Sequence, residues 1–136
     1  MITITEKSRA AVRALTELAA RADAAPVPIL EVSERRGVPL HLLEQLFSGL
    51  RRAGVLQSQR GVKGGYSFQR DPAEVTLLEV VEIVDGRLGW TQDAMSGCDQ
   101  VWQEAKGRLA SLLADLTVAD MVDLESRTTR APMFHI

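Results

Sequence analysis

Residues 37–67 read GVPLHLLEQLFSGLRRAGVLQSQRGVKGGYS, and this stretch decides the fold. Pro39 suits the first position of a helix, because its missing amide hydrogen would find no partner there in any case. Ala53-Gly54 is typical of a helix end. Between these limits apolar residues recur at i, i+3, i+4 and i+7, which predicts an amphipathic helix. Its core-facing residues are Leu43, Leu46, Phe47 and Leu50.

The opposite face of this helix is polar and is suited to reading DNA. An α-helix fits the major groove, and Glu, Gln and His side chains hydrogen-bond to base edges. Any solvated helix face has a similar composition, so the helix alone leaves both interpretations open. The predicted DNA contacts in this segment are Pro39, His41, Leu42, Glu44, Gln45, Ser48, Arg51 and Arg52.

A hairpin is expected after the helix. Val55–Ser58 and Tyr66–Gln69 have strand character, and Gly61–Gly65 forms a Gly-rich turn between them. Glycines let a backbone approach phosphates or a minor groove closely, and two cations flank them. An ordinary hairpin is the alternative, whereas a nucleotide-binding loop is excluded because the G-x-x-x-x-G-K-[ST] pattern is missing and no helix follows. The predicted DNA contacts here are Arg60, Gly61 and Lys63.

Two helices are expected before residue 37. Thr5 can cap the first, whose inward stripe lasts to about Ala22. After a linker, a second helix should run from about Ile29 to Arg36 and end at Gly37. The second and third helices then form a helix-turn-helix, with the third in the major groove. The predicted fold class is mainly α with a small β-hairpin wing, that is, a winged helix-turn-helix followed by a long C-terminal helix.

Three helices are expected beyond the hairpin. Thr76 opens the first in a capping box. Residues 87–97 lack periodicity, and a long helix begins at about Asp99. Thr117 begins a second capping box, which predicts a last helix to about Arg127.

The long helix carries an apolar stripe that needs a cover. Packing against its own domain is the alternative, but a helix of this length on a small domain is easier to bury against a second copy. The predicted dimer interface consists of Val101, Trp102, Ala105, Leu109, Leu112, Leu113 and Leu116.

Charge is distributed unevenly along the 136 residues. The formal net charge is -2, but residues 1–70 hold 11 Lys or Arg against 6 Asp or Glu, and residues 71–136 hold 5 against 12. A basic half is typical of a protein that binds phosphates, and an acidic half is repelled by DNA; chance clustering is the alternative. The sequence has neither an apolar run of membrane-spanning length nor a signal peptide, so we expect a cytoplasmic protein without a membrane partner.

Six motifs stand along the chain: Lys7–Leu15, Leu43–Leu46, Leu50–Leu56, Arg60-Gly61, Gly64–Tyr66 and Thr76–Val81. In order and spacing they resemble the motifs of the IscR, CymR and NsrR type of bacterial regulator, the Rrf-two family. The resemblance implies a homodimeric, sequence-specific transcription regulator, expected to be a repressor acting on a pseudo-palindromic operator in double-stranded DNA. It implies a winged helix-turn-helix domain over 1–86, an effector or interface loop over 87–98, and a dimerisation helix with a C-terminal helix over 99–136.

The chain departs from part of this family in its cysteines. Iron-sulfur members resemble one another in carrying three cysteines in the loop before the dimerisation helix, whereas this chain has only Cys98. A cluster needs about four soft ligands. Some cluster-binding relatives carry an acidic ligand at position 8, which here is Ser8. We therefore expect no cofactor and no metal, with an incompletely Cys-ligated iron-sulfur cluster as the alternative. The other candidate donors are His41, Asp93, Asp99 and His135.

Cys98 is open to further interpretations. A lone cysteine is often a small buried residue. Exposed at a helix N-terminus, its thiolate would be a redox sensor, because aligned amide dipoles stabilise negative charge. Trp90, Met95 and Trp102 are able to line a pocket for a small effector or to bind a partner protein, and otherwise form the packed end of the dimer interface.

Catalysis is not expected, because two distant histidines and one cysteine leave no constellation for nucleophilic or metal-assisted chemistry. The rival to DNA binding is a winged-helix module that binds a metabolic enzyme. A steep salt dependence of association with duplex DNA favours DNA binding, and a salt-tolerant complex through residues 87–98 favours the protein-binding module.

Overall fold

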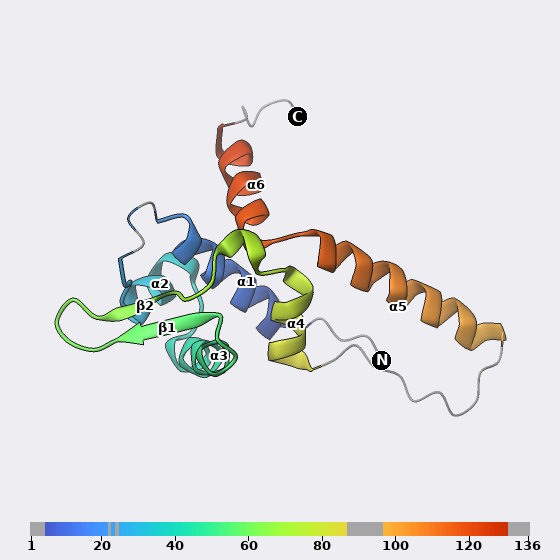
Figure 1. The fold of residues 1–136 in the computed structure, drawn as a ribbon, viewed down its shortest axis with the longest axis horizontal. Coiled ribbons are helices and arrows are strands. Elements are labelled where there is room, and N and C mark those ends of the chain that lie inside the picture. The colour runs from blue at the N-terminus through green and yellow to red at the C-terminus, as the bar shows by residue number, and fades with distance from the viewer. Residues whose placement is uncertain (1–4, 22, 24, 87–96, 131–136) are drawn as a thin grey trace.

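The computed structural model describes residues 5–21, 23, 25–86 and 97–130. The fold is mainly helical with one antiparallel two-stranded hairpin, which confirms the predicted fold class (Figure 1). The elements in chain order are α1 (Glu6–Ala19), α2 (Ile29–Arg36), α3 (Leu40–Arg52), β1 (Leu56–Gln59), β2 (Gly65–Phe68), the 3-10 turn η1 (Pro72–Glu74), α4 (Leu77–Asp85), α5 (Gly97–Asp115) and α6 (Val118–Arg130).

The apolar stripe of α3 lies in the core, as its spacing predicts. Leu43, Phe47 and Leu50 are completely buried, and Leu46 is nearly so. They belong to one cluster with the buried residues of α1, α2 and α4. Full burial of such a side chain contributes about 1.5–3 kcal/mol, so α3 is held firmly by its inner face while its outer face stays in solvent.

The turn between α2 and α3 is tight and internally bonded. Gly37 ends α2 with φ 64°, a left-handed conformation that glycine adopts without a Cβ clash. The Val38 amide donates to the Ser33 carbonyl (3.2 Å), and the Ser33 hydroxyl donates to the Val38 carbonyl (2.6 Å). Pro39 is the N-cap of α3 and not its first helical residue, because its ψ of 135° is extended.

Several other boundaries also differ by one to three residues from those predicted; for example, α5 begins at Gly97 instead of about Asp99, and α6 ends at Arg130 instead of about Arg127. Helix α1 ends at Ala19 instead of about Ala22, and the Arg21 amide closes it by donating to the Leu18 carbonyl (3.2 Å). Strand β1 begins one residue later than predicted, because the Val55 amide still donates to the Leu50 carbonyl at the end of α3 (3.0 Å).

The junction between α5 and α6 is joined to the start of α4 by backbone pairing. The Leu77 amide donates to the Leu116 carbonyl, and the Val118 amide donates to the Val75 carbonyl, both at 2.9 Å. Val75 and Val118 are completely buried. At this junction the predicted capping box forms in full, because Thr117 and Asp120 each accept a hydrogen bond from the other's backbone amide through their side chains. The C-terminal end of α5 is therefore anchored in the body of the protein.

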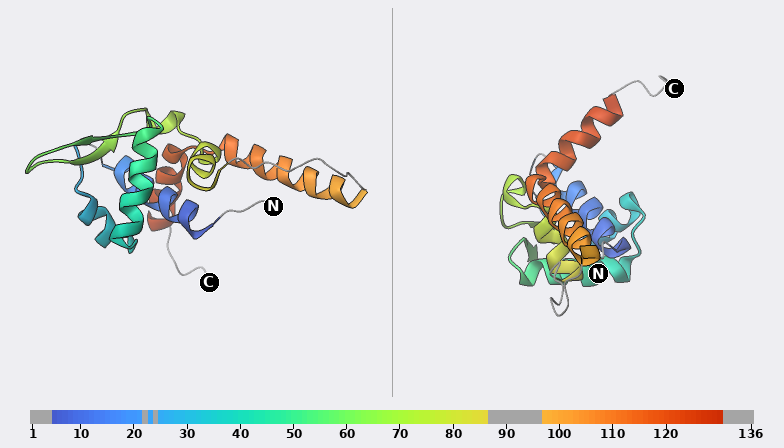
Figure 2. Two further views of the ribbon diagram at one scale, coloured as in Figure 1. Left: turned by 90° about the horizontal axis from the view of Figure 1, so that it is seen from below. Right: turned by 90° about the vertical axis from the view of Figure 1, so that its right-hand side faces the viewer.

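The rest of α5 projects from that body. In Figures 1 and 2 the hairpin tip and the N-terminal end of α5 lie at opposite ends of the long axis. No residue of α5 is buried within the described structure, and Val101, Trp102 and Leu112 are 60%, 59% and 57% exposed. These three residues keep more than half of their surface in solvent, whereas Leu109, Leu113 and Leu116 of the same stripe are half-buried.

Candidate nucleic-acid interface

The outer face of α3 presents most of the predicted DNA contacts to solvent. Ser48 is half-buried between them. Leu42 is also half-buried and packs against the core. It lines an open pocket together with Gln45 and Arg52, so it stays among the predicted DNA contacts. The exposed residues are Pro39, His41, Glu44, Gln45, Arg51 and Arg52.

The wing is a regular hairpin with an exposed cationic tip. Its strands pair from Leu56 opposite Phe68 to Gln59 opposite Gly65. The turn is closed by the Gly64 amide, which donates to the Gly61 carbonyl (2.9 Å). A Cβ at residue 64 would overlap the Gln59 carbonyl, so glycine is required for this close approach. The exposed tip residues are Arg60, Gly61, Val62 and Lys63.

The wing and α3 are held in a fixed relation by contacts that the sequence did not reveal. The rings of Phe47 and Tyr66 meet edge to face, with centroids 5.0 Å apart. On the far side of β2, Val27 and Tyr66 exchange two backbone hydrogen bonds of 2.9 Å each. A Cβ at residue 65 would overlap the Val27 carbonyl. Val27, in the segment before α2, thus forms an isolated antiparallel bridge beside β2.

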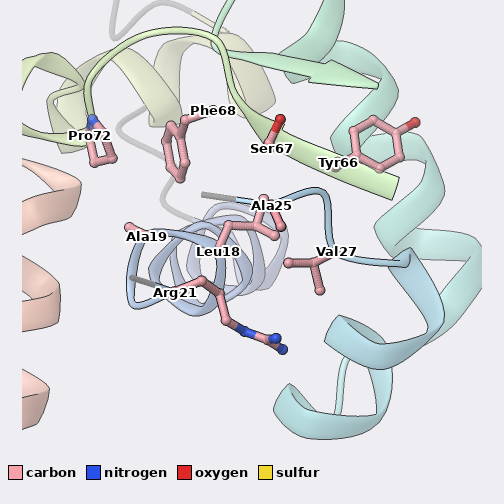
Figure 3. A pocket seen from close by; sticks show the side chains of 9 residues that line it. All are labelled: Leu18, Ala19, Arg21, Ala25, Val27, Tyr66, Ser67, Phe68 and Pro72. Carbon is pink, nitrogen blue, oxygen red and sulfur yellow. The ribbon is translucent and has the colours of Figure 1, made fainter. Parts of the chain in front are cut away.

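A cavity of about 210 Å³ lies at the root of the wing (Figure 3). Its walls come from the end of α1, the segment before α2, and β2. The guanidinium of Arg21, on its rim, is bonded to Glu31 and Glu17 and is therefore already partnered. The lining residues are Leu18, Ala19, Arg21, Ala25, Val27, Tyr66, Ser67, Phe68 and Pro72.

Three well-paired arginines contrast with the cations of the candidate interface. Arg21, Arg36 and Arg70 are ion-paired, and the hydrogen bonds that they donate to Glu31, Glu125 and Glu79 respectively raise their pKa values. By contrast, within the described part of the chain, four cations of the candidate interface form no ion pair and remain exposed. Positive charge is therefore available for phosphates on α3 and at the wing tip. These four residues are Arg51, Arg52, Arg60 and Lys63.

A helix-turn-helix with a solvated third helix and a cationic wing defines a winged-helix DNA-binding transcription regulator. The chain belongs to the Rrf2 family, whose model, described as an iron-dependent transcriptional regulator, matches residues 4–124. As a member of a family of transcription regulators, the protein is not an enzyme.

Relatives and solved structures agree with this assignment. The HTH-type transcriptional regulator IscR of Escherichia coli O1:K1 / APEC is 35% identical over 129 residues, covering 88% of this chain and 80% of IscR. The structure of T. potens IscR aligns with a TM-score of 0.81 at 27% identity, covering 97% of this chain and 93% of that one. CymR, the global cysteine regulator of B. subtilis, aligns with a TM-score of 0.81 at 25% identity, covering 91% and 98%. No helix in the described ranges is long and apolar enough to cross a membrane.

The described residues do not fit the donor set of an iron-sulfur cluster. Cys98 is exposed at the start of α5, and no three His, Cys, Asp or Glu side chains of the described part gather as metal ligands. Ser8 is buried, and its hydroxyl donates to the Asp85 carboxylate of the same chain. The candidate donors Asp93 and His135, and the loop residues Trp90 and Met95, lie outside the described residues.

Asp85 ties the end of α4 to the beginning of α1. Its carboxylate accepts hydrogen bonds from the Ser8 hydroxyl, from the Thr5 hydroxyl (2.7 Å to Oδ1) and from the Thr5 amide (3.2 Å to Oδ2). Partial burial raises the pKa of Asp85, but these hydrogen bonds together outweigh it and leave the pKa below its usual value. An ionised Asp85 is therefore part of the folded structure at neutral pH.

Proposed function

We propose that the protein is a homodimeric repressor that binds a pseudo-palindromic operator through α3 and the wing. The observation that carries this proposal is the rigid pairing of an exposed polar helix face with an exposed cationic tip. Phe47, Tyr66 and Val27 hold the two parts in one orientation. Two DNA-contacting parts with a fixed relation are able to contact adjacent grooves of one duplex simultaneously.

The two parts are given different roles. Glu44 and Gln45 lie on the solvent face of α3, where they are able to hydrogen-bond to base edges and select the sequence. Arg60 and Lys63 lie at the wing tip, where positive charge attracts phosphates or the minor groove without selecting bases directly. Arg51 and Arg52 at the end of α3 add further phosphate contacts.

The dimer is proposed from the exposed stripe of α5. Val101, Trp102 and Leu112 present large apolar surfaces to water in a single chain, and such patches mark interaction sites. Near the base of α5, Leu113 lines an apolar groove of about 320 Å³ together with Val12 and Val81. A second copy that covers the stripe and the groove would bury both. The full proposed interface is Val101, Trp102, Ala105, Leu109, Leu112, Leu113 and Leu116.

Selection of duplexes from a random library tests the DNA part of the proposal. The selected sequences should contain two inverted half-sites, and affinity for them should fall steeply as salt rises, because several cations displace counterions from phosphates. Selection of no sequence, or binding that salt leaves unchanged, would contradict the proposal. A reporter placed behind the selected operator should be silenced by the protein, whereas increased expression would show an activator.

A redox response through Cys98 is the second candidate, favoured by the exposure of its thiol at the start of α5. Exposed thiolates are oxidised first to sulfenic acid, which reductants reverse. Peroxide should then weaken operator binding by the wild type but not by Cys98→Ser. An iron assay on protein purified without oxygen tests the cluster alternative, and a salt-tolerant complex with an enzyme tests the interaction-module alternative.

A further inference from the structure

Arg36, the last residue of α2, is held by two carboxylates from distant parts of the chain. Its Nε donates to Glu17 Oε1 of α1 (3.0 Å). Its Nη1 and Nη2 donate to Glu125 Oε2 and Oε1 of α6 (2.7 and 2.9 Å), which is a two-point contact that fixes orientation as well as distance. The Arg36 side chain is 17% exposed and that of Glu125 49%, so the guanidinium is shielded from solvent while the carboxylate is partly open to it.

The backbone of Arg36 is fixed as well. Its carbonyl accepts a hydrogen bond from the Arg13 guanidinium of α1. Gly37 and Val38, which follow directly, form the turn of the helix-turn-helix. The entry to this turn is therefore set by α1 and α6 and not by α2 alone.

The other end of α6 leads to the proposed dimer helix. Val118, its first residue, is completely buried, and its amide pairs with the Val75 carbonyl beside the end of α5. A continuous set of ordered contacts thus runs from α5 through the junction and α6 to Arg36. The contact spans 89 positions of sequence between Arg36 and Glu125.

We propose that the Arg36–Glu125 pair is a positioning contact that transmits the orientation of α5 to the helix-turn-helix and so sets the spacing of the two recognition helices. This inference rests on the proposed dimeric operator binding. Neither residue touches DNA. Their role is to fix the angle of the helix-turn-helix relative to α5, so that only one separation of half-sites is bound at full affinity.

The test compares Glu125→Gln with Asp123→Asn in the full-length protein. Asp123 is an exposed carboxylate on the same helix, so its removal changes the net charge equally without touching Arg36. The probes are the duplex selected by the wild type and the same duplex with one base pair inserted or removed between its half-sites. We expect Glu125→Gln to lose roughly 2- to 30-fold affinity for the selected duplex. It should lose much less on the altered spacings, so its preference for one spacing should flatten, while Asp123→Asn should keep the wild-type preference.

A second readout needs no DNA. Hydrogen exchange of the Gly37 and Val38 amides should quicken in Glu125→Gln and stay at the wild-type rate in Asp123→Asn. Arg36→Lys keeps the charge but loses the two-point geometry, and it should lie between wild type and Glu125→Gln in both readouts.

The possible results distinguish a failure of the positioning role from a failure of the proposed operator binding. If the wild type selects a spaced operator and Glu125→Gln equals Asp123→Asn in spacing preference and exchange, the positioning role is overturned alone. If the wild type selects no duplex, the proposed function and this inference both fail.

Discussion

Replacing Asp85 by Ala should destabilise the fold, because it removes the hydrogen-bond acceptor of a buried hydroxyl group. Ser8 is 1% exposed, and its hydroxyl donates to the Asp85 carboxylate. Without that acceptor a buried donor is left unsatisfied, which costs about 1–3 kcal/mol, whereas the half-buried Thr5 recovers bonds to water. Urea unfolding should therefore show a free energy of unfolding that is lower by about 1–3 kcal/mol in the variant. The protein concentration is kept fixed, because the stability of a dimer depends on it.

A double-mutant cycle isolates the Ser8 contribution. In a Ser8→Ala background no buried hydroxyl is left without an acceptor, so Asp85→Ala should lower the free energy of unfolding distinctly less there. An equal cost in both backgrounds would refute the assigned cause. Glu82→Ala, close to Asp85 on α4, is the matched control and should have a smaller effect, because among the described residues the Glu82 side chain forms no hydrogen bond; its backbone carbonyl, which the substitution keeps, accepts from the Gly86 amide.

The same contact predicts a pH dependence of definite sign. The pKa of Asp85 in the folded protein is lower than in the unfolded chain, because the hydrogen bonds from Ser8 and Thr5 outweigh the opposing effect of partial burial. Such a group stabilises the fold above the unfolded pKa, and that contribution disappears as pH falls through the folded pKa. The stability difference between wild type and Asp85→Asn should thus be constant at neutral pH and shrink as pH falls below about 4. A difference that grows with acidification would show the sign to be wrong.

Leu112→Glu should give monomers in sedimentation equilibrium, because it would bury a charge without a partner in the proposed interface, and a variant that still dimerises would move the interface elsewhere. Lys63→Ala should weaken binding to all duplexes and lower the salt slope by about one, whereas a loss confined to one sequence would mean base reading by the wing. Glu44→Ala should change which operator is preferred, by about 1–3 kcal/mol per lost base contact, and an equal loss on every sequence would show that this side chain reads no base. Gly65→Ala should detach the wing from Val27, because the new Cβ would overlap that carbonyl; unchanged exchange of the Val27 and Tyr66 amides would contradict this.

Local signals in the sequence located the main elements of the fold. The apolar spacing from Leu43 to Leu50 located α3, and Gly37 located its turn, because helix periodicity and left-handed backbone are properties of neighbouring residues. The polar face of α3 followed from the same periodicity. Leu42 lies at the edge of the apolar stripe, where periodicity does not separate core from surface, and it is half-buried.

Contacts between distant segments had no such signal. The pairing of Val27 with Tyr66, and the meeting of Arg36 with Glu125, join residues whose local sequence gives no sign of the partner. Arg36 looks like any cation near a helix C-terminus, and Glu125 like any solvated carboxylate. The helices and the hairpin were therefore predictable to a large extent, and the contacts between distant segments that hold them in place were not.

Because α5 is anchored at its C-terminal end, a small rotation there displaces its N-terminal end by a much larger distance. Its 19 residues span about 28 Å at 1.5 Å per residue. A rotation of about 10° at the junction of Leu116 and Val118 would move the Gly97 end by about 5 Å. In the opposite direction, a displacement of about 5 Å where Cys98 lies corresponds to a turn of only about 10° at the junction. A movement at the far end of α5 is thus converted into a small rotation beside the buried Val75 and Val118.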